Sequence, residues 1–174
     1  MKQLFILALT LFTTFTFSCS DILNTNLRIL DSDDEKNLCE YSGNVILVVN
    51  VASRCGYTPQ YAGLQRLYNQ FKEDGLTIIG IPSRDFFQEF SAESKVAEFC
   101  STEYGVEFPM FATAKVKGKK AHPFYKKLIA ASGKEPKWNF AKYLIGRDGQ
   151  VIEHYKSSVT PESERLVTAI QAVL

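Results

Sequence analysis

Residues 45–60 read Val-Ile-Leu-Val-Val-Asn-Val-Ala-Ser-Arg-Cys-Gly-Tyr-Thr-Pro-Gln. The apolar run from Val45 to Val51 is typical of a strand that is buried on both faces in a largely parallel sheet. A short polar turn follows, and Pro59 is placed to begin a helix near its first turn. We therefore expect Cys55 on a strand-to-helix turn, beside the positive end of a helix dipole, where the reactive thiolate form is stabilised.

The chain beyond this turn predicts an α/β unit. Apolar side chains recur at helical spacing from Tyr61 to Phe71, and Leu76–Ile81 reads as a second buried strand. A strand, a helix and a strand with short connections form a right-handed unit with parallel strands. The loop at residues 82–90 then lies at the same end of the sheet as Cys55, which is where ligand sites in such sheets gather.

The second half of the chain adds helices and a hairpin. Helices are predicted from Ser91, from His122-Pro123 and from Pro161, and residues 143–152 read as a β-hairpin. Residues 108–111 are apolar but contain a proline, which indicates an edge or a loop. The order of elements matches a thioredoxin-like α/β fold with a central mixed sheet flanked by helices.

Composition limits the classes of function. The chain has 174 residues, of which 45% are hydrophobic and 22% charged, as expected for one globular domain. A formal charge of +1 gives no electrostatic reason to bind nucleic acid. The two histidines show no metal-ligand spacing, so we expect neither a metal nor another cofactor.

The N-terminal residues are typical of an export signal. Residues 1–19 combine an early lysine with an apolar, threonine-containing run that is short for a membrane span, and residues 20–36 read as a polar segment before a domain at 37–174. Cys19 resembles the lipid-modified cysteine of bacterial lipoproteins, and simple cleavage near Ser20 is the alternative. We expect a periplasmic or secreted protein, with membrane anchoring through Cys19 left open.

Cleavage also changes the count of cysteines. Without Cys19, the domain keeps Cys39, Cys55 and Cys100, and an odd number suggests at most one disulfide and at least one special thiol. Cys39 precedes a turn and is expected to be structural. Cys55 could also be a buried structural cysteine, but the adjacent Arg54, the turn and the helix start favour reactivity.

A family resemblance rests on the same turn. Asn50-Val51-Ala52-Ser53-Arg54-Cys55-Gly56-Tyr57-Thr58 resembles the peroxidatic motif of the glutathione peroxidase family in its cysteine form, and the resemblance runs from about Asn37 to the C-terminus. It implies a thiol peroxidase that reduces hydrogen peroxide and organic or lipid hydroperoxides, in response to oxidative stress. Cys55 would be the nucleophile, oxidised to a sulfenic acid.

The resemblance also implies the hydrogen-bond donors. Trp138 and Asn139 match the family's Trp-Asn motif and would stabilise the leaving oxygen as it gains negative charge. Gln88 matches the family's catalytic glutamine. Its loop is one residue shorter than in the family and carries Phe87 in place of a glycine, so Gln88 could be displaced by roughly one residue's reach, about 3.5 Å.

Cys100 occupies a position like that of the resolving cysteine in thioredoxin-dependent members. It would form an intramolecular disulfide with Cys55, and its helix would then have to unwind in part. The alternative is a core residue on the apolar face of that helix. The short segment between Pro123 and Trp138 resembles monomeric members, and no cluster of basic residues for glutathione is recognisable. The expected reductant is a thioredoxin-like protein, with glutathione as the other possibility.

Two other functions stay open at this point. One is a thiol-disulfide oxidoreductase of the thioredoxin type, which Thr58 disfavours because the second sulfur of a Cys-x-x-Cys motif would stand there. The other is a peroxide sensor that signals through a Cys55–Cys100 disulfide.

Overall fold

The central strand of the sheet is β3 (Val45–Val51), and every one of its residues is buried. In this computed structural model, which describes residues 19–174, β3 pairs in parallel with β4 (Leu76–Pro82) and antiparallel with β5 (Lys142–Ile145). β6 (Val151–Tyr155) completes the order β4-β3-β5-β6. The predicted mixed sheet is confirmed, and the long apolar run occupies its most enclosed position.

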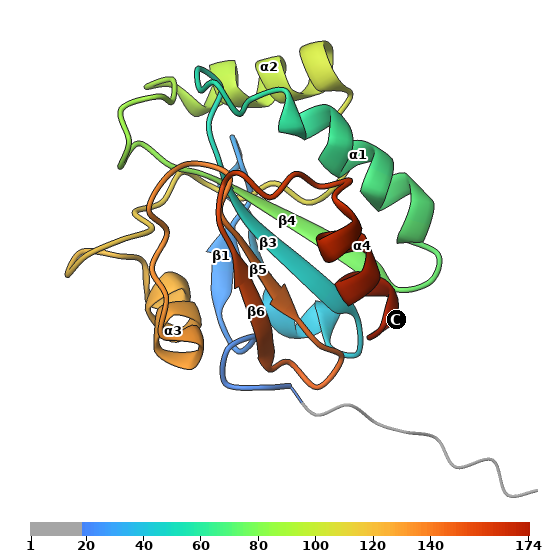
Figure 1. Cartoon of the computed structure of the whole chain (residues 1–174). Helices are drawn as coiled ribbons and strands as arrows, with labels where there is room; N and C mark the ends of the chain where they lie inside the picture. Colours follow the sequence, from blue (N-terminus) through green and yellow to red (C-terminus); the bar gives the residue numbers. More distant parts are fainter. Residues whose placement is uncertain (1–18) are drawn as a thin grey trace, which may run out of the picture.

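Helices cover both faces of the sheet (Figure 1). α1 (Gln60–Phe71) and α4 (Glu164–Gln171) pack on one face, while α3 (Pro123–Ser132) lies on the other. Because side chains alternate along a strand, β3 contributes to two separate cores. Val45, Leu47, Val49 and Val51 join the core on the α1 side, and Ile46 and Val48 join the other.

Helix α2 (Glu93–Tyr104) lies at the end of the sheet where β3 and β4 finish (Figure 1). Of its residues, only Val96 and Cys100 are buried, and the N-cap residue Ala92 offers no side chain to the free backbone N–H groups. Gly105 ends the helix in the left-handed conformation, at a φ of 57°. α2 is therefore held by little buried apolar surface.

The segment around Pro109 lies along the outer edge of β4 without becoming a full strand, as its proline predicts. The Gly80 N–H donates to the Pro109 carbonyl over 2.9 Å, and the Phe111 N–H donates to the Gly80 carbonyl over 2.9 Å. A side chain at position 80 would collide with Met110, since a Cβ there would lie 2.3 Å from the Met110 sulfur. Glycine is needed for this close approach.

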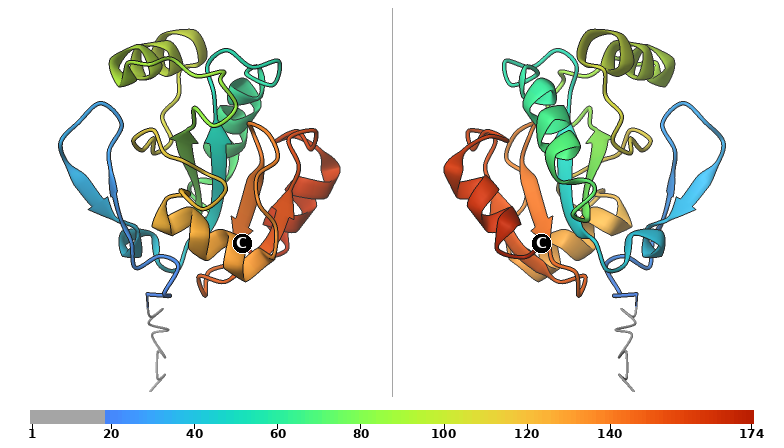
Figure 2. Two further views of the ribbon diagram at one scale, coloured as in Figure 1. Left: turned by 90° about the vertical axis from the view of Figure 1, so that its left-hand side faces the viewer. Right: turned by 90° about the vertical axis from the view of Figure 1, so that its right-hand side faces the viewer.

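The residues that we expected to precede the domain are packed against it. Ile22, Leu23 and Leu27 are buried in the core on the α3 side. β1 (Asn26–Arg28) and β2 (Glu35–Asn37) form an antiparallel hairpin on the opposite side of the molecule from α4 (Figure 2). The charged residues 31–36 are solvated as expected, since none of them is buried, and Glu35 and Lys36 belong to β2.

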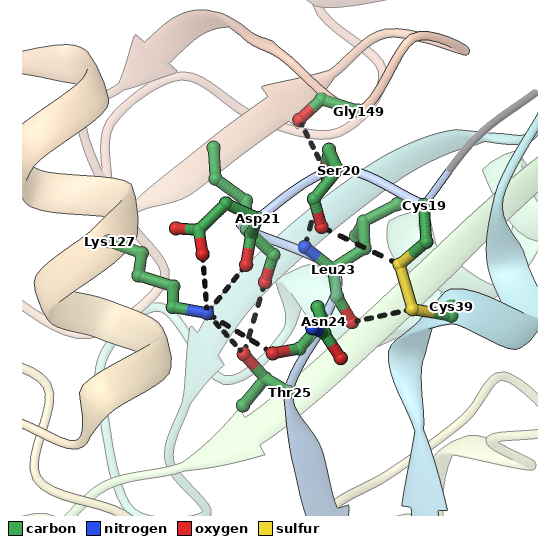
Figure 3. Close-up of polar contacts among 10 residues, drawn as sticks. Cys19, Ser20, Asp21, Leu23, Asn24, Thr25, Cys39, Lys127 and Gly149 are labelled. Atoms are coloured by element: carbon green, nitrogen blue, oxygen red, sulfur yellow. Dashed lines mark hydrogen bonds and ion pairs between the residues drawn. A yellow bond between two sulfur atoms is a disulfide. The ribbon is translucent and has the colours of Figure 1, made fainter.

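A disulfide joins Cys19 to Cys39, the second residue of the 3-10 helix η1 (Leu38–Tyr41). Lys127 of α3 donates from Nζ to the carbonyls of Asp21, over 2.5 Å, and Asn24, over 3.1 Å (Figure 3). Cys39 is thus structural, as expected. Cys19, which we expected to be removed or lipidated, is bonded to Cys39 in this structure, and removal and lipidation stay predictions.

The predicted helices and hairpin are present with small shifts. α2 and α4 begin two or three residues later than expected, and β5 and β6 are the predicted hairpin. Residues 1–18, which carry the predicted export signal, lie outside the described residues. Among residues 19–174, no helix combines the length and the apolar character needed to cross a membrane.

Candidate active site

The turn after β3 holds Cys55 in a fixed frame of hydrogen bonds. The Thr58 hydroxyl accepts from the Cys55 N–H over 2.9 Å and donates to the Ala52 carbonyl over 2.9 Å. The backbone N–H of Tyr57 points at the Cys55 sulfur over 3.4 Å. Cys55 is 7% exposed and forms no disulfide. Its sulfur lies on the turn that leads into α1, with one N–H donor directed at it.

The loop between β4 and α2 is fastened to this turn. The Arg54 N–H donates to the Gln88 carbonyl over 3.0 Å. The Ser53 N–H donates to both carboxylate oxygens of Glu89, each over 3.2 Å. Glu89 is 5% exposed, and burial raises the pKa of its carboxyl group. These bonds place the loop against the Cys55 turn even though the loop is shorter than in the resembling family.

A second turn, before β5, presents Trp138 and Asn139. Asn50, near the end of β3, donates from its side chain to the Trp138 carbonyl over 3.0 Å. The Asn50 carbonyl accepts from the Phe140 N–H over 2.6 Å. Phe140 has a φ of 62°, a conformation that a bulky residue adopts only when its surroundings enforce it. Asn50 therefore connects the Cys55 strand to the Trp138–Asn139 turn.

The two predicted amide donors meet. Asn139 Nδ2 donates to Gln88 Oε1 over 3.1 Å, so Gln88 lies against Asn139 despite the one-residue deletion. Asn139 is fully buried, and its Oδ1 has no partner among the described residues. Trp138 is 41% exposed and packs on Phe86, with ring centroids 5.3 Å apart. The structure thus brings Gln88, Asn139 and Trp138 to the end of the sheet that carries Cys55.

Lys142 is a buried lysine without a carboxylate partner in the described chain. Its Nζ donates to the Gln60 side-chain oxygen over 2.5 Å, the Phe140 carbonyl over 2.8 Å and the Val159 carbonyl over 2.7 Å. Burial lowers the pKa of Lys142 to about 7. The lysine connects the start of α1, the turn before β5 and the segment before α4.

Cys100 lies on the buried side of α2 with a free thiol. It is 2% exposed and belongs to the same core as Cys55 and Tyr61. Burial raises the pKa of the Cys100 thiol to about 11. In the folded helix Cys100 is therefore a protonated, weakly nucleophilic thiol.

A cavity of about 1100 Å³ opens beside Trp138. Tyr57 and Trp138 line it on the Cys55 side, and its cationic lining comes from four side chains: Lys134, Lys137, Lys156 and Arg165. These residues are spread over the sequence, which is why no basic cluster was recognisable there. Folding gathers them next to the candidate active site.

Sequence reasoning identified the donors but not the residues that hold them. Neither Glu89 nor Lys142 was assigned a role from the sequence. Both lie close in sequence to predicted site residues, since Glu89 follows Gln88 directly and Lys142 is three residues after Asn139. No group of histidine, cysteine or carboxylate side chains in residues 19–174 is arranged to hold a metal ion.

A cysteine-centred site at the carboxyl end of β3, in a fold of this kind, is found in the thiol-dependent oxidoreductases with a thioredoxin-like fold. The profile of the family described as "Glutathione peroxidase" matches residues 22–129, and this chain belongs to that family. It is an oxidoreductase that acts on peroxide.

Relatives with curated names support the assignment. A "Glutathione peroxidase homolog BsaA" of Halalkalibacterium halodurans is 44% identical over 137 residues, covering 76% of this chain and 87% of the relative. A "Hydroperoxy fatty acid reductase gpx1" of Synechocystis is 43% identical, covering 72% and 80%. The "Thioredoxin/glutathione peroxidase BtuE" of Escherichia coli is 35% identical, covering 88% and 97%.

Solved structures agree on the fold. The crystal structure of Trgpx in its apo form is similar with a TM-score of 0.70 at 32% identity, covering 89% of this chain and 96% of the other. A putative thiol:disulfide interchange protein from Chlorobium tepidum reaches a TM-score of 0.62 at 17% identity, covering 86% and 94%. The thioredoxin-like α/β fold predicted from the sequence is confirmed.

Proposed function

We propose that this thiol peroxidase reduces hydrogen peroxide and organic or lipid hydroperoxides at Cys55, in the response to oxidative stress. The observation that carries the proposal is the Gln88–Asn139 pair, which lies with Trp138 at the end of β3 where the Cys55 turn is fixed. Such a group of uncharged, preorganised donors suits a transition state in which an oxygen gains negative charge.

The first step is attack of the Cys55 thiolate on the peroxide. A sulfur–oxygen bond forms as the O–O bond breaks, leaving a Cys55 sulfenic acid and an alkoxide or hydroxide that takes up a proton. The Trp138 indole N–H and the Gln88 and Asn139 amides stabilise the departing oxygen. The backbone N–H of Tyr57 already points at the attacking sulfur.

Cys100 resolves the sulfenic acid. Its thiol displaces the hydroxyl of the Cys55 sulfenic acid, which forms an intramolecular disulfide and releases water. A buried thiol with a raised pKa reacts poorly inside α2, so the helix opens first. The small buried surface of α2 and its uncapped start keep the cost of opening low.

A thioredoxin-like protein supplies the two electrons that restore both thiols, with glutathione as the alternative reductant. The relative from Escherichia coli carries both thioredoxin and glutathione in its name, and the relative from Synechocystis is named for fatty acid hydroperoxides. The cationic lining of the cavity beside Trp138 suits a carboxylate on either a fatty acid hydroperoxide or a peptide thiol. We further propose a monomer that acts after export.

The test is peroxide turnover coupled to thioredoxin and its reductase, for the wild type, Cys55→Ser and Cys100→Ser. We expect turnover in the wild type, none in Cys55→Ser, and a stalled sulfenic acid in Cys100→Ser that a dimedone adduct reveals by mass. Equal turnover in Cys55→Ser and the wild type would contradict the proposal. Full turnover in Cys100→Ser would leave Cys55 as the nucleophile and remove Cys100 from the cycle.

A further inference from the structure

Phe87 is the most exposed large apolar side chain in the described part of the molecule. It is 93% exposed, while its neighbours Phe86 and Glu89 are buried. Its φ of 60° lies in the left-handed region, which an aromatic residue adopts at a cost. Phe87 therefore exposes an apolar ring to solvent from a strained backbone, one residue before Gln88. Such an exposed apolar group indicates a surface that binds a partner.

Two more aromatic side chains are exposed around the same site. Trp138 is 41% exposed and Tyr57 is 37% exposed, and both line the cavity beside the Cys55 turn. Trp138 also packs on Phe86, next to Phe87. Only one other large apolar side chain in residues 19–174 is similarly exposed, Ile152 on β6. The exposed apolar surface therefore gathers at the mouth of the active site.

Lysines of the 115–120 loop border these rings. Asp85 accepts from the Val116 N–H over 2.7 Å, and Lys117 Nζ lies 4.3 Å from the centroid of the Phe86 ring. These contacts fix the loop beside Phe87. We define the aromatic–lysine face as the following residues: Tyr57, Phe87, Trp138, Lys115, Lys117, Lys119, Lys120 and Lys137.

The carboxylates near this face are already engaged. Asp85 is largely buried beneath Lys115, and Glu135 pairs with Lys137 and accepts from the Gly118 N–H. None of the ion pairs found within residues 19–174 includes Lys117, Lys119 or Lys120. The face thus offers apolar rings bordered by three lysines outside these ion pairs, Lys117, Lys119 and Lys120, and by two paired lysines, Lys115 and Lys137.

We propose that the aromatic–lysine face docks this peroxidase on a bilayer that contains anionic lipids, where it meets lipid hydroperoxides. Aromatic rings at the level of the headgroups, with lysines on anionic lipids, are the usual side chains of a protein that lies on a membrane. The inference rests on the proposed peroxidase function. It makes Phe87 an anchor and places Gln88 and Cys55 at the membrane surface.

A reductant protein fits this face less well, because it must reach Cys100. The exposed side of α2 carries Glu98 and Glu103, so the charge next to Cys100 is largely acidic. Lys95 is the one lysine of α2, and the lysines of the aromatic–lysine face lie on the 115–120 loop and beside Trp138. The two sides of the site therefore differ in charge, and the cationic side is matched to an anionic surface.

The N-terminal end of the described chain lies far from this face. Ser20 bonds to Gly149 in the β5–β6 turn, and Figure 1 shows that turn at the opposite end of the sheet from the start of α1. Insertion of residues near the N-terminus into a bilayer would leave Trp138 in water. Because Trp138 is the only tryptophan in the chain, its fluorescence distinguishes the two modes of binding.

The test is quenching of tryptophan fluorescence by vesicles of brominated phosphatidylcholine and phosphatidylglycerol in a 7:3 ratio, with the full chain. We expect quenching in the wild type that weakens in 0.5 M salt. Phe87→Gly should weaken apparent binding by about tenfold or more, the value of a buried phenylalanine ring. Glycine suits the left-handed backbone at this position, so Phe87→Gly should not lower Tm.

Three further variants test whether vesicle binding depends on the lysines and the apolar side chains of this face rather than on those elsewhere on the surface. Lys119→Gln with Lys120→Gln should weaken binding about thirtyfold, whereas Lys72→Gln with Lys95→Gln makes the same change of net charge away from the face and should leave binding as in the wild type. Ile152→Ser removes a similar exposed apolar side chain and should also bind as the wild type does.

Three results would overturn the docking. One is co-sedimentation with vesicles without quenching of Trp138, and another is equal quenching in Phe87→Gly and the wild type. The third is normal vesicle binding by Phe87→Gly with a tenfold higher KM for thioredoxin, which would assign the face to the reductant. Hydrogen peroxide turnover of the wild type, measured without vesicles, tests the proposed function separately.

Discussion

Asn139 donates its side-chain amide to Gln88 over 3.1 Å and so joins two turns that lie 51 residues apart in the chain. The bond orients both amides at the same end of the sheet as Cys55. Asn139 is buried, while Gln88 sits in a loop with an exposed neighbour, Phe87. The buried partner thus fixes the donor that the shortened loop would otherwise leave free.

Loss of the Gln88 amide should reduce the rate of peroxide reduction. We expect Gln88→Ala to lower kcat/KM for hydrogen peroxide by about 10²-fold, the usual effect of removing one preorganised donor. Gln150→Ala, in the exposed β5–β6 turn, is the matched control and should leave the rate unchanged. The measurement is the rate of Cys55 oxidation in a stopped-flow experiment. A change of less than twofold in Gln88→Ala would remove Gln88 from the donor set.

The sequence predicted the elements that depend on local pattern. The buried run at β3, the helical spacing of α1 and the proline in residues 108–111 each indicate one structure whatever surrounds them. The position of Gln88 could not be predicted, because the deletion in its loop is compensated by two hydrogen bonds that form only in the fold. The Ser53 N–H donates to Glu89, and the Asn139 amide donates to Gln88. The packing of residues 20–27 was missed because their few apolar side chains are separated by polar ones.

Glu89 should give the protein a measurable pH dependence of stability. Burial raises the carboxyl pKa in the folded state above its ordinary value of 4.5. As pH rises from 4.5 to the raised value, the unfolded chain releases the proton while the folded chain keeps it, so stability falls across that window. We expect Glu89→Gln to lack this decline.

The measurement for Glu89 is urea unfolding of the wild type and Glu89→Gln at several pH values from 4 to 8. The free energy of unfolding of the wild type, relative to the variant, should decrease as pH rises. Glu98→Gln on the exposed side of α2 serves as the control and should follow the wild type. A constant difference between wild type and Glu89→Gln over the whole range would contradict the assignment.

The Cys19–Cys39 disulfide should stabilise the fold. It closes a loop with a sequence separation of 20, for which the chain-entropy estimate is about 3 kcal/mol. We expect Cys39→Ser to lower Tm by about 6–12 °C, and dithiothreitol to do the same to the wild type. Cys55→Ser should leave the Tm nearly unchanged, because that thiol is free.

Alkylation before reduction provides the direct check of this pairing. Mass spectrometry of the enzyme alkylated as purified, before any reductant or peroxide is added, should show label on Cys55 and Cys100 and none on Cys39. Label on Cys39 in the absence of a reductant would show that the disulfide is not present.

Lys142 couples three segments around the active site, and its removal should show in stability as a function of pH. Lys142→Met leaves the Gln60, Phe140 and Val159 oxygens without their donor. We expect the free energy of unfolding to fall by about 1–3 kcal/mol at pH 7.

The pKa of Lys142 in the folded chain, about 7, lies below the ordinary value of 10.5. Between these values the unfolded chain binds the proton that the folded chain has released, so the wild type gains stability as pH rises. The gap between the wild type and Lys142→Met should therefore be wider at pH 9.5 than at pH 6.5 in urea unfolding, and Lys156→Met, at an exposed lysine, should show no such widening. A gap of the same size at both pH values would mean that Lys142 stays charged in the core and that its three acceptors fully offset its burial.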